Sequence, residues 1–524
     1  PFATLDTSST NGRQVSFAGQ NPRFNRFTID GVPITDSFGL NPDALPSRRG
    51  PVPLDSIGQF ETKVAPYDIR EGFFQGGVSN AILKSGTNDW HGTAFFTYSS
   101  DALTGKKTAP YITRPDGRIP LPSFESKDFG ATLSGPIIKD KLFFMVSAER
   151  VRAARPVQPG TVEDNSGTPV TGATNADLAL IQSIAKTKYS FDPGGILKTD
   201  GDKDDRIVGR LDANLSETQR VSLTGLYTKD SLIVNTTTGN TNLGLSSNAY
   251  TKPNKLRAGI LNWNADWSEK FSTEFRALYK AYDSGQFPLM GRTAQFAICA
   301  DPNTPNRTGG ATTTNASLSC PSGTPQYIIG SGGPSQSNVL QVRTWGGSIS
   351  AKLRAGDHNF RLLGEWNHTK TFNLFVNPSA GSYYFDSIAD FRNGNAQSFS
   401  YNNAGTLNPN DAAANFSYDT YTFGLQDDWR VNKMLSVTAG LRYDVYGTSS
   451  HPQLNPNFLT RYGFPNTYSI EGMGLLQPRV GFTFTPTPRL TVRGGGGIFG
   501  GGSPDVYIGN SFSNTGVINT SITA

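Results

Sequence analysis

The segment with the clearest potential for ion chemistry is the acidic run at residues 200–205, where carboxylates alternate as they do in a calcium-binding loop. An EF-hand loop needs a glutamate at its last position, and Leu211 stands there instead. The run is therefore either a cation site or a solvated acidic loop. We favour the solvated loop.

Histidine, glycine and nucleophile patterns give no support for catalysis. The 4 histidines, His91, His358, His368 and His451, lack the closely spaced partner ligands of a zinc site. The glycine run at 494–497 is not followed by the Lys-Ser/Thr of a phosphate-binding loop. Because no nucleophile with a partnering base can be assembled from spacing alone, we predict no catalytic site, no metal site and no cofactor, and no enzyme activity.

The two cysteines, Cys299 and Cys320, lie in a stretch rich in glycine, proline, threonine and asparagine. This context favours a disulfide that closes a loop in an oxidising compartment over two free thiols.

The composition indicates a large β protein as the scaffold for these residues. Among 524 residues there are 57 glycines and 33 prolines, 11% are aromatic and only 17% are charged. The aromatic content argues against disorder, and no stretch approaches the about 18 apolar residues of a spanning helix. The net charge of +5 is spread along the chain without a basic cluster, which argues against a nucleic-acid partner.

Period-two alternation of apolar and polar residues dominates the chain from about residue 90 and predicts β-strands. In the clearest case Leu435, Leu441 and Tyr443 share one face, and Arg442 and Asp444 share the other. The predicted strands are 90–99, 127–136, 141–150, 204–213, 219–229, 255–267, 271–282, 339–354, 358–371, 415–430, 433–446, 476–485 and 488–499. Many have the length of about 9–11 residues that crosses a bilayer when tilted.

The connections between these strands alternate between short and long. The long ones are 100–126, 151–203, 230–254, 284–338, 372–414 and 448–475. An up-and-down outer-membrane barrel has this arrangement, with tight turns at one end and long loops at the other. A soluble all-β protein with long insertions is the alternative.

Residues 1–88 differ from the rest, with dense glycine and proline and no strand of membrane length. Residues 26–33 predict a short strand that runs into a turn at Asp30 and Gly31, and 76–84 predict a strand that starts at Gly76 and Gly77. We expect a small α+β unit, and the lumen of a large barrel is a place where such a unit can lie.

Several motifs resemble those of the TonB-dependent outer-membrane transporters. The segments 29–32 (IDGV), 54–57 (LDSI), 60–63 (FETK) and 76–80 (GGVSN) resemble consecutive motifs of the plug domain, with Arg26, Asp30, Gly31, Gly76, Gly77 and Asn80 at plug-motif positions. Residues 84–92 (KSGTNDWHG) resemble the crossing from the plug to the first strand. Residues 129–144, 426–430 (QDDWR), 441–443 (LRY), 477–481 (QPRVG) and 493–497 (RGGGG) resemble strands of the large Oar-like branch.

The resemblance implies a mostly β fold, a partial transmembrane antiparallel β-barrel with about 13 of the family's 22 strands. Residues 1–88 are expected to be the C-terminal part of the plug and 89–524 the N-terminal part of the barrel with long extracellular loops. We expect a fragment that lacks both ends, from the outer membrane of a Gram-negative-type bacterium. The implied partners are outer-membrane lipid, the TonB complex acting on a missing N-terminal segment, and an extracellular ligand of unknown class.

The implied function is import of a scarce or bulky ligand, a siderophore, glycan or peptide, through the plugged barrel. An outer-membrane adhesion or protein-translocation component built on the same barrel is the alternative. Loop 151–203 contains a helical pattern at 175–186 with Asn175 as N-cap, which we interpret as a packed lid helix. The aromatic residues of loop 372–414, among them Tyr383 and Phe391, are expected to pack rather than to bind a ligand. The ligand-binding residues are unknown from the sequence.

Strand alternation places several charged side chains on the lumen face: Glu274, Arg276, Lys280, Arg361, Glu365 and Arg442. We hypothesise that the plug arginines Arg26 and Arg70 form ion pairs with Glu274 and Glu365. Independent solvation of these charges is an equally open interpretation. Partly solvated pairs of this kind contribute about 1 kcal/mol or less each, so they could hold the plug and still release it.

Overall fold

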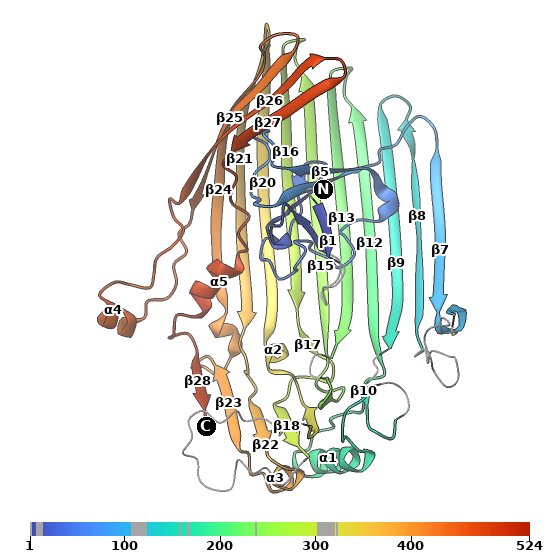
Figure 1. Cartoon of the computed structure of the whole chain (residues 1–524), viewed down its shortest axis with the longest axis vertical. Coiled ribbons are helices and arrows are strands. Elements are labelled where there is room, and N and C mark those ends of the chain that lie inside the picture. The colour runs from blue at the N-terminus through green and yellow to red at the C-terminus, as the bar shows by residue number, and fades with distance from the viewer. Residues whose placement is uncertain are drawn as a thin grey trace.

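The computed structural model describes residues 3–6, 14–105, 123–156, 159–164, 168–235, 238–300, 320 and 323–524. Its largest element is a curved sheet of 14 strands, the wall, whose order follows the chain from β7 to β27 (Figure 1). One of the 14, β17 (Phe287–Pro288), is a short side strand on β15. The other thirteen are the strands predicted from the alternation, and each pairs antiparallel with the next.

The long strands of the wall are bounded as follows. They are β7 (His91–Ser100), β8 (Glu125–Ile138), β9 (Leu142–Pro156), β12 (Thr199–Asn214), β13 (Gln219–Val234), β15 (Tyr250–Asp266), β16 (Phe271–Gly285), β20 (Asn338–Ala355), β21 (His358–Phe375), β24 (Ala414–Arg430), β25 (Leu435–Gly447), β26 (Gly474–Thr487) and β27 (Leu490–Gly497). The short turns gather at one end of the wall and the long connections at the other (Figure 1). The predicted alternation of connection length is confirmed.

The two faces of the wall differ in the way that the alternation predicts. Outward side chains such as Ile207, Ile349 and Phe423 are apolar and half exposed. Inward side chains such as Arg206 and Arg442 are polar and buried. Apolar residues outward and polar residues inward are the pattern of a barrel that faces lipid.

Residues 200–205 are not a loop. They lie in β12, where Asp202 and Asp204 point inward and are buried, while Lys203 points outward and is exposed. The interpretation as a solvated loop was wrong because the charges in this run are neutralised by arginines distant in the sequence, so the segment can continue as a strand.

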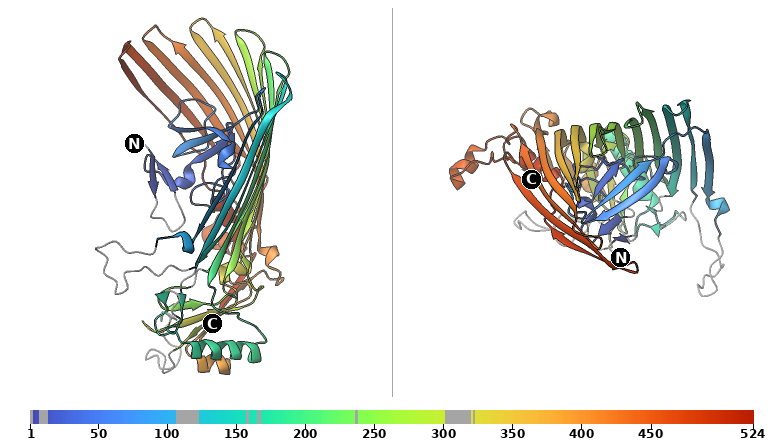
Figure 2. Two further views of the ribbon diagram at one scale, coloured as in Figure 1. Left: turned by 90° about the vertical axis from the view of Figure 1, so that its right-hand side faces the viewer. Right: turned by 90° about the horizontal axis from the view of Figure 1, so that it is seen from above.

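The described part of residues 1–88, to which we give the label plug, lies against the concave face of the wall (Figure 2). Its core is a four-stranded sheet of order β4-β3-β6-β5. These strands are β3 (Arg26–Ile29), β4 (Val32–Pro33), β5 (Ile57–Val64) and β6 (Gly77–Leu83), accompanied by the 3-10 turns η1 (Pro22–Phe24) and η2 (Leu54–Ser56) and the separate hairpin β1 (Ala3–Asp6) and β2 (Gln14–Phe17). The strands expected at 26–33 and 76–84 are present.

One side of the plug packs on the wall through what we call the apolar contact. Plug residues including Ile29, Val32 and Ile34 form a single buried cluster with wall residues including Val208 and Leu256. Ile29, Ile34, Val208 and Leu256 are fully buried. Burial of such side chains contributes about 1.5–3 kcal/mol each, so this cluster fixes the plug against the strands from β9 to β16.

The long connections fold together into a loop cap at the far end of the wall (Figure 1). Its sheet has the order β14-β19-β18-β22-β23-β28. The strands are β14 (Asn242–Gly244), β18 (Gln295–Cys299), β19 (Gln326–Ile329), β22 (Ser382–Phe385), β23 (Ser398–Asn403) and β28 (Thr520–Thr523), and the shorter pair is β10 (Pro159–Gly160) and β11 (Thr168–Pro169). The helices of the long connections are α1 (Asn175–Lys188), α2 (Gly333–Gln336), α3 (Ile388–Asn393), α4 (Pro456–Tyr462) and α5 (Val506–Ser513).

The cap has its own hydrophobic core. Ile181 of α1 packs in one cluster with Phe385 and Phe391, and Tyr383 packs against that cluster from outside. The expected packed helix and the packing of the loop aromatics are therefore confirmed. The helix begins one residue earlier than expected, because Thr174 rather than Asn175 is the N-cap, and its hydroxyl accepts a hydrogen bond from the Asp177 backbone at 3.1 Å.

In the part of the chain that the structure describes, no helix combines the length and the apolar character needed to cross a bilayer.

Candidate functional site

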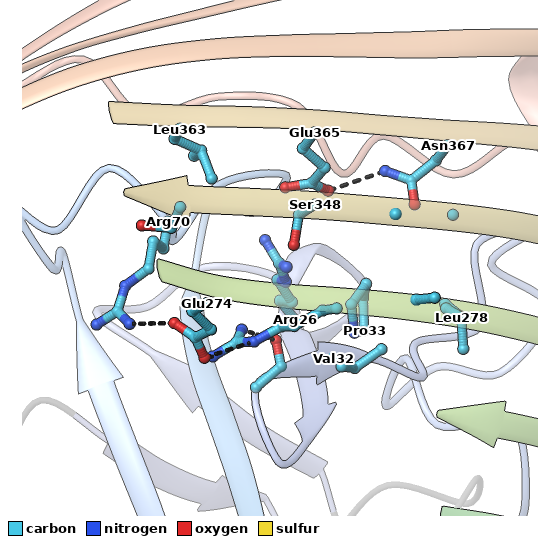
Figure 3. A pocket seen from close by; sticks show the side chains of 16 residues that line it. Arg26, Val32, Pro33, Arg70, Glu274, Leu278, Ser348, Leu363, Glu365 and Asn367 are labelled. Atoms are coloured by element: carbon cyan, nitrogen blue, oxygen red, sulfur yellow. Dashed lines mark hydrogen bonds and ion pairs between the residues drawn. The ribbon is translucent and has the colours of Figure 1, made fainter. Parts of the chain in front are cut away.

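The surface where the plug meets the wall contains the densest set of charged contacts in the chain's interior. Arg70 of the plug donates to Glu274 of β16 at 3.1 Å (Figure 3). Glu274 is also paired with Arg276 on the same strand. Arg276 in turn donates to the backbone oxygen of Gly31 at 3.0 Å, so one wall carboxylate and one wall guanidinium hold two separate segments of the plug.

Arg26 and Glu365 do not form the ionic contact that we predicted for them. Arg26 is buried and donates to the backbone oxygen of Gly72 at 2.6 Å, within the plug itself. Glu365 accepts from Asn367, its neighbour on the same face of β21, at 2.8 Å. Both residues line the cavity shown in Figure 3, but among the described residues no ion pair joins them.

Most plug–wall ion pairs among the described residues join residues whose pairing we did not predict from the sequence. The Asp30 carboxylate pairs with Arg210 of β12 at 2.7 Å. Asp202 of β12 pairs with both Arg48 and Arg49 of the plug, at 2.8 Å each. Alternation along β12 could have placed Asp202 and Arg210 on the lumen face, but their partners lie more than a hundred residues away in the chain.

The turn at Asp30 and Gly31 has the expected position and a specific stereochemistry. Both residues have a positive φ, 49° at Asp30 and 77° at Gly31. A Cβ on Gly31 would lie 2.6 Å from Nη1 of Arg276, so glycine is required both by conformation and by the close approach of the wall. The side-chain oxygen of Asn80 accepts from the Gly31 backbone at 3.0 Å and fixes the turn to β6. Burial raises the pKa of Asp30 in spite of the Arg210 guanidinium.

Gly76 and Gly77 stand at the start of β6, where the backbone passes close to other segments. A Cβ on Gly77 would lie 2.6 Å from the ring of Phe17, and the Gly77 backbone donates to the Asn25 side chain at 3.4 Å. A Cβ on Gly76 would lie 2.3 Å from the same Asn25 side chain. These two plug-motif positions therefore serve packing within the plug rather than contact with the wall.

Residues 68–71 of the plug form what we call the polar contact with β21, β24, β25 and β26. Asp68 pairs with Arg361 of β21 at 2.8 Å and with Arg70 at 2.7 Å. Burial alone would raise the pKa of Asp68, but the hydrogen bonds and charge of Arg70, together with Arg361, outweigh it and hold the pKa below its ordinary value. Asp68 therefore stays ionised near neutral pH.

Two further wall arginines complete the polar contact by donating to plug backbone oxygens. Arg442 is fully buried and donates to Ile69 at 2.8 Å, and Arg479 of β26 donates to Glu71 at 2.6 Å. Lys280 makes a similar contact elsewhere, to Thr35 at 2.8 Å. Arg442 and Lys280 therefore face the lumen as expected. Their side chains donate to backbone carbonyls of the plug rather than to its carboxylates.

A segment after β27 also reaches the plug. The Asp505 backbone donates to Ser37 at 2.9 Å, and the carboxylate of Asp505 accepts from the hydroxyl of Tyr418 at 2.8 Å. Burial raises the pKa of Asp505 to about 7. Sequence reasoning missed this contact, because residues 500–505 carry no pattern beyond glycine and proline.

Small cavities line the plug–wall boundary between these contacts. One of about 300 Å³ is bordered by Asp30, Lys63 and Arg210, and it shares Arg70 and Glu274 with the cavity of Figure 3. Another, of about 130 Å³, lies beside Lys280 and Tyr418. A polar cavity of about 300 Å³ has room for water between the plug and the wall.

The structure joins Cys299 and Cys320 by a disulfide bond within the connection between β18 and β19. The residues that this bond spans lie largely outside the described part of the chain. Within the described residues no group of three or more histidine, cysteine, aspartate or glutamate side chains could hold a metal ion.

Comparison with known proteins decides the family. The family model described as an outer membrane beta barrel domain matches residues 82–183 and 165–524. The chain belongs to this family. Its place is therefore the outer membrane of a Gram-negative bacterium, which agrees with the apolar outer face of the wall.

Beyond that family, the chain is similar to transporters and receptors of the outer membrane. It is 30% identical over 162 residues to the TonB-dependent transporter Oar of Myxococcus xanthus, a match that covers 29% of this chain and 14% of Oar. Its fold is similar to that of the outer membrane transporter YddB from Escherichia coli, with a TM-score of 0.62 at 12% identity, covering 100% of this chain and 60% of YddB. The siderophore receptor PirA from Acinetobacter baumannii follows with a TM-score of 0.54 at 16% identity, covering 94% of this chain and 56% of PirA.

The outer-membrane family member described here thus spans little more than half the length of these solved relatives. The relatives are transporters and receptors rather than enzymes.

Proposed function

We propose that this chain is the plug and part of the wall of a TonB-dependent receptor that imports a scarce or bulky ligand. The observation that carries the proposal is the polar contact, in which residues 68–71 of the plug are held by directional bonds from wall arginines beside a polar cavity with room for water. Directional contacts next to water can be exchanged for water contacts when the plug is pulled, whereas a dry seal cannot.

In this proposal residues 1–88 act as the plug domain and residues 89–524 as the wall with its extracellular loops. The TonB complex would supply the pulling force through a segment N-terminal to residue 1. The loop cap is the first surface that a ligand meets, since binding residues on a rigid scaffold usually lie on its loops. PirA is a siderophore receptor, and siderophore, glycan and peptide all remain candidates for the ligand of this chain.

A disulfide that locks the plug to the wall tests the proposal. The side chain of Ile69 occupies a notch in the wall, and its Cβ lies 3.5 Å from the position that a Cβ on Gly424 of β24 would take. This separation suits a disulfide. The described residues contain no free cysteine that would compete with the new pair.

We expect the double variant Ile69→Cys, Gly424→Cys to lose ligand uptake when oxidised and to regain it on mild reduction. The ligand is found first, by growth of a deletion strain on a panel of iron chelates, oligosaccharides and peptides. The single variants Ile69→Cys and Gly424→Cys are the matched controls and should import under both conditions. Full uptake by the oxidised double variant would contradict the proposal. An adhesin built on the same wall would instead show no uptake in any form, the unaltered protein included.

A further inference from the structure

The outer face of the wall carries a cluster of cations that the plug–wall contacts do not use. We call it the basic band, and its members are Lys127, Arg150, Arg152, Lys203, Lys229 and Lys255. They come from β8, β9, β12, β13 and β15 and lie within a few residues of the ends that lead into the loop cap (Figure 1). Their outward direction follows from the alternation, because Asp202 and Asp204 on either side of Lys203 are buried inside.

The strand register sets like charges directly opposite one another in this band. Arg152 is opposite Lys127 on β8 and also opposite Lys203 on β12. Lys229 of β13 is opposite Lys255 of β15. On their other sides, Lys229 is opposite Asp205 of β12 and Lys255 is opposite Asp283 of β16. Like charges at directly opposed positions destabilise a sheet unless an anion lies between or above them.

The carboxylates on the same face balance only part of this charge. Glu125 pairs with Lys127 at 2.9 Å, and Asp205 pairs with Arg150 at 2.7 Å and with Arg152 at 2.8 Å. Lys203 and Lys229 are exposed and form no ion pair or hydrogen bond with the described residues. The Lys255 ammonium lies 5.8 Å from the centroid of the Tyr227 ring, and the opposed Asp283 is already paired with Arg257 and Arg343.

The band stands at the edge of the lipid-facing surface. Further toward the short turns, beyond Asp205 and Arg257, outward positions on β8, β9, β12 and β13 are apolar and about half exposed: Leu133, Val146, Ile207, Leu211 and Leu223. In outer-membrane barrels the long loops mark the extracellular side. The basic band therefore lies where the phosphate groups of the outer leaflet meet the hydrocarbon.

We propose that the basic band binds the phosphate groups of lipid A, the phosphorylated lipid of the outer leaflet. Neighbouring strands are about 4.8 Å apart, so the opposed lysines and arginines present several donors over the width of one headgroup. The arginine guanidinium offers bidentate geometry to phosphate, and each lysine adds a point charge. The inference depends on the outer-membrane location and not on import, so it can fail while the proposed function stands.

The test uses the full-length protein in detergent and the triple variant Lys203→Gln, Lys229→Gln, Lys255→Gln. These three side chains make no ion pair with any residue that the structure describes, so their replacement should leave the fold intact. Binding of bisphosphorylated lipid A is measured by native mass spectrometry and titration. Since each surface lysine contributes about fivefold to binding of an anionic lipid surface, we expect the triple variant to bind about a hundredfold more weakly.

The matched control is Lys139→Gln, Lys141→Gln, Lys270→Gln, which removes the same charge from exposed lysines at the short turns. It should bind lipid A as the unaltered protein does. Dephosphorylated lipid A should bind weakly to every form, and inorganic phosphate at the same concentration should not compete. Equal affinity of the triple variant and the control would overturn the proposal, as would equal affinity for dephosphorylated lipid A or for phosphatidylglycerol.

Discussion

Two of the surfaces through which the plug touches the wall have opposite character. At the apolar contact, Ile29 and its neighbours pack against aliphatic side chains from β9 to β16. At the polar contact, residues 68–71 meet Arg361, Arg442 and Arg479 from β21 to β26. The free energy of apolar packing is proportional to the buried area and insensitive to salt, whereas the free energies of hydrogen bonds and ion pairs depend on their geometry and on competition with water.

The difference between the apolar and the polar contact explains how the wall can hold the plug and still release it. An apolar contact must be separated over its whole area, so it keeps the plug attached to the wall. The polar contact can exchange its bonds for water one at a time, since a cavity already borders Arg70 and Glu71 on the plug side. We therefore expect an opening to begin on the side of β21 to β26.

The largest effect should come from Arg442→Met. Arg442 is fully buried, pairs with Asp444 at 2.9 Å and also binds the Ile69 backbone, so its removal leaves a buried carboxylate without its cation. We expect a loss of about 3–5 kcal/mol in the free energy of unfolding, measured by denaturant titration in lipid. The exposed Arg461→Met on α4 is the control and should change stability by less than about 0.5 kcal/mol. An equal loss in both variants would remove the distinction between buried and exposed arginines.

The apolar contact should respond next, through Ile29→Ala. Ile29 is fully buried in the cluster, so its truncation should lower the free energy of unfolding by about 2–4 kcal/mol, with no dependence on ionic strength. Limited proteolysis of the plug at low and high salt, beside an unfolding titration, measures both properties. Leu54→Ala, at an exposed plug residue, is the control. A salt-dependent loss at Ile29 would mean that the two contacts are not physically separate.

The smallest effect should come from Arg70→Gln. Arg70 is about one-third exposed, and both of its partners keep another cation, Arg361 for Asp68 and Arg276 for Glu274. We expect the free energy that holds the plug against the wall to fall by about 1 kcal/mol or less at low salt, and the difference to disappear near 1 M salt. The protease resistance of the plug measures this free energy. A loss as large as that of Arg442→Met at every salt concentration would show that partly solvated pairs hold the plug.

Strand positions were predictable because alternation is a local property. Leu435 to Tyr443 alternate in the sequence as they do in β25, and the lumen positions of Arg276, Lys280, Arg361 and Arg442 followed from the same rule. The pairing of charges did not follow. Arg70 meets Glu274 as hypothesised, yet Arg26 and Glu365 share a cavity without an ion pair, because Arg26 turns back to Gly72.

The sequence by itself determined the strands, the tight turns and which side chains face the lumen, since each depends on neighbours within a few residues. Only the tertiary structure decided that Asp202 belongs to a strand held by Arg48 and Arg49, and that Asp30 meets Arg210. The same holds for Lys203 and its opposed Arg152, which are scattered in the chain and gathered by the register of the wall. Ion pairs and charged surfaces join segments distant in sequence, and their geometry exists only once the strands are aligned.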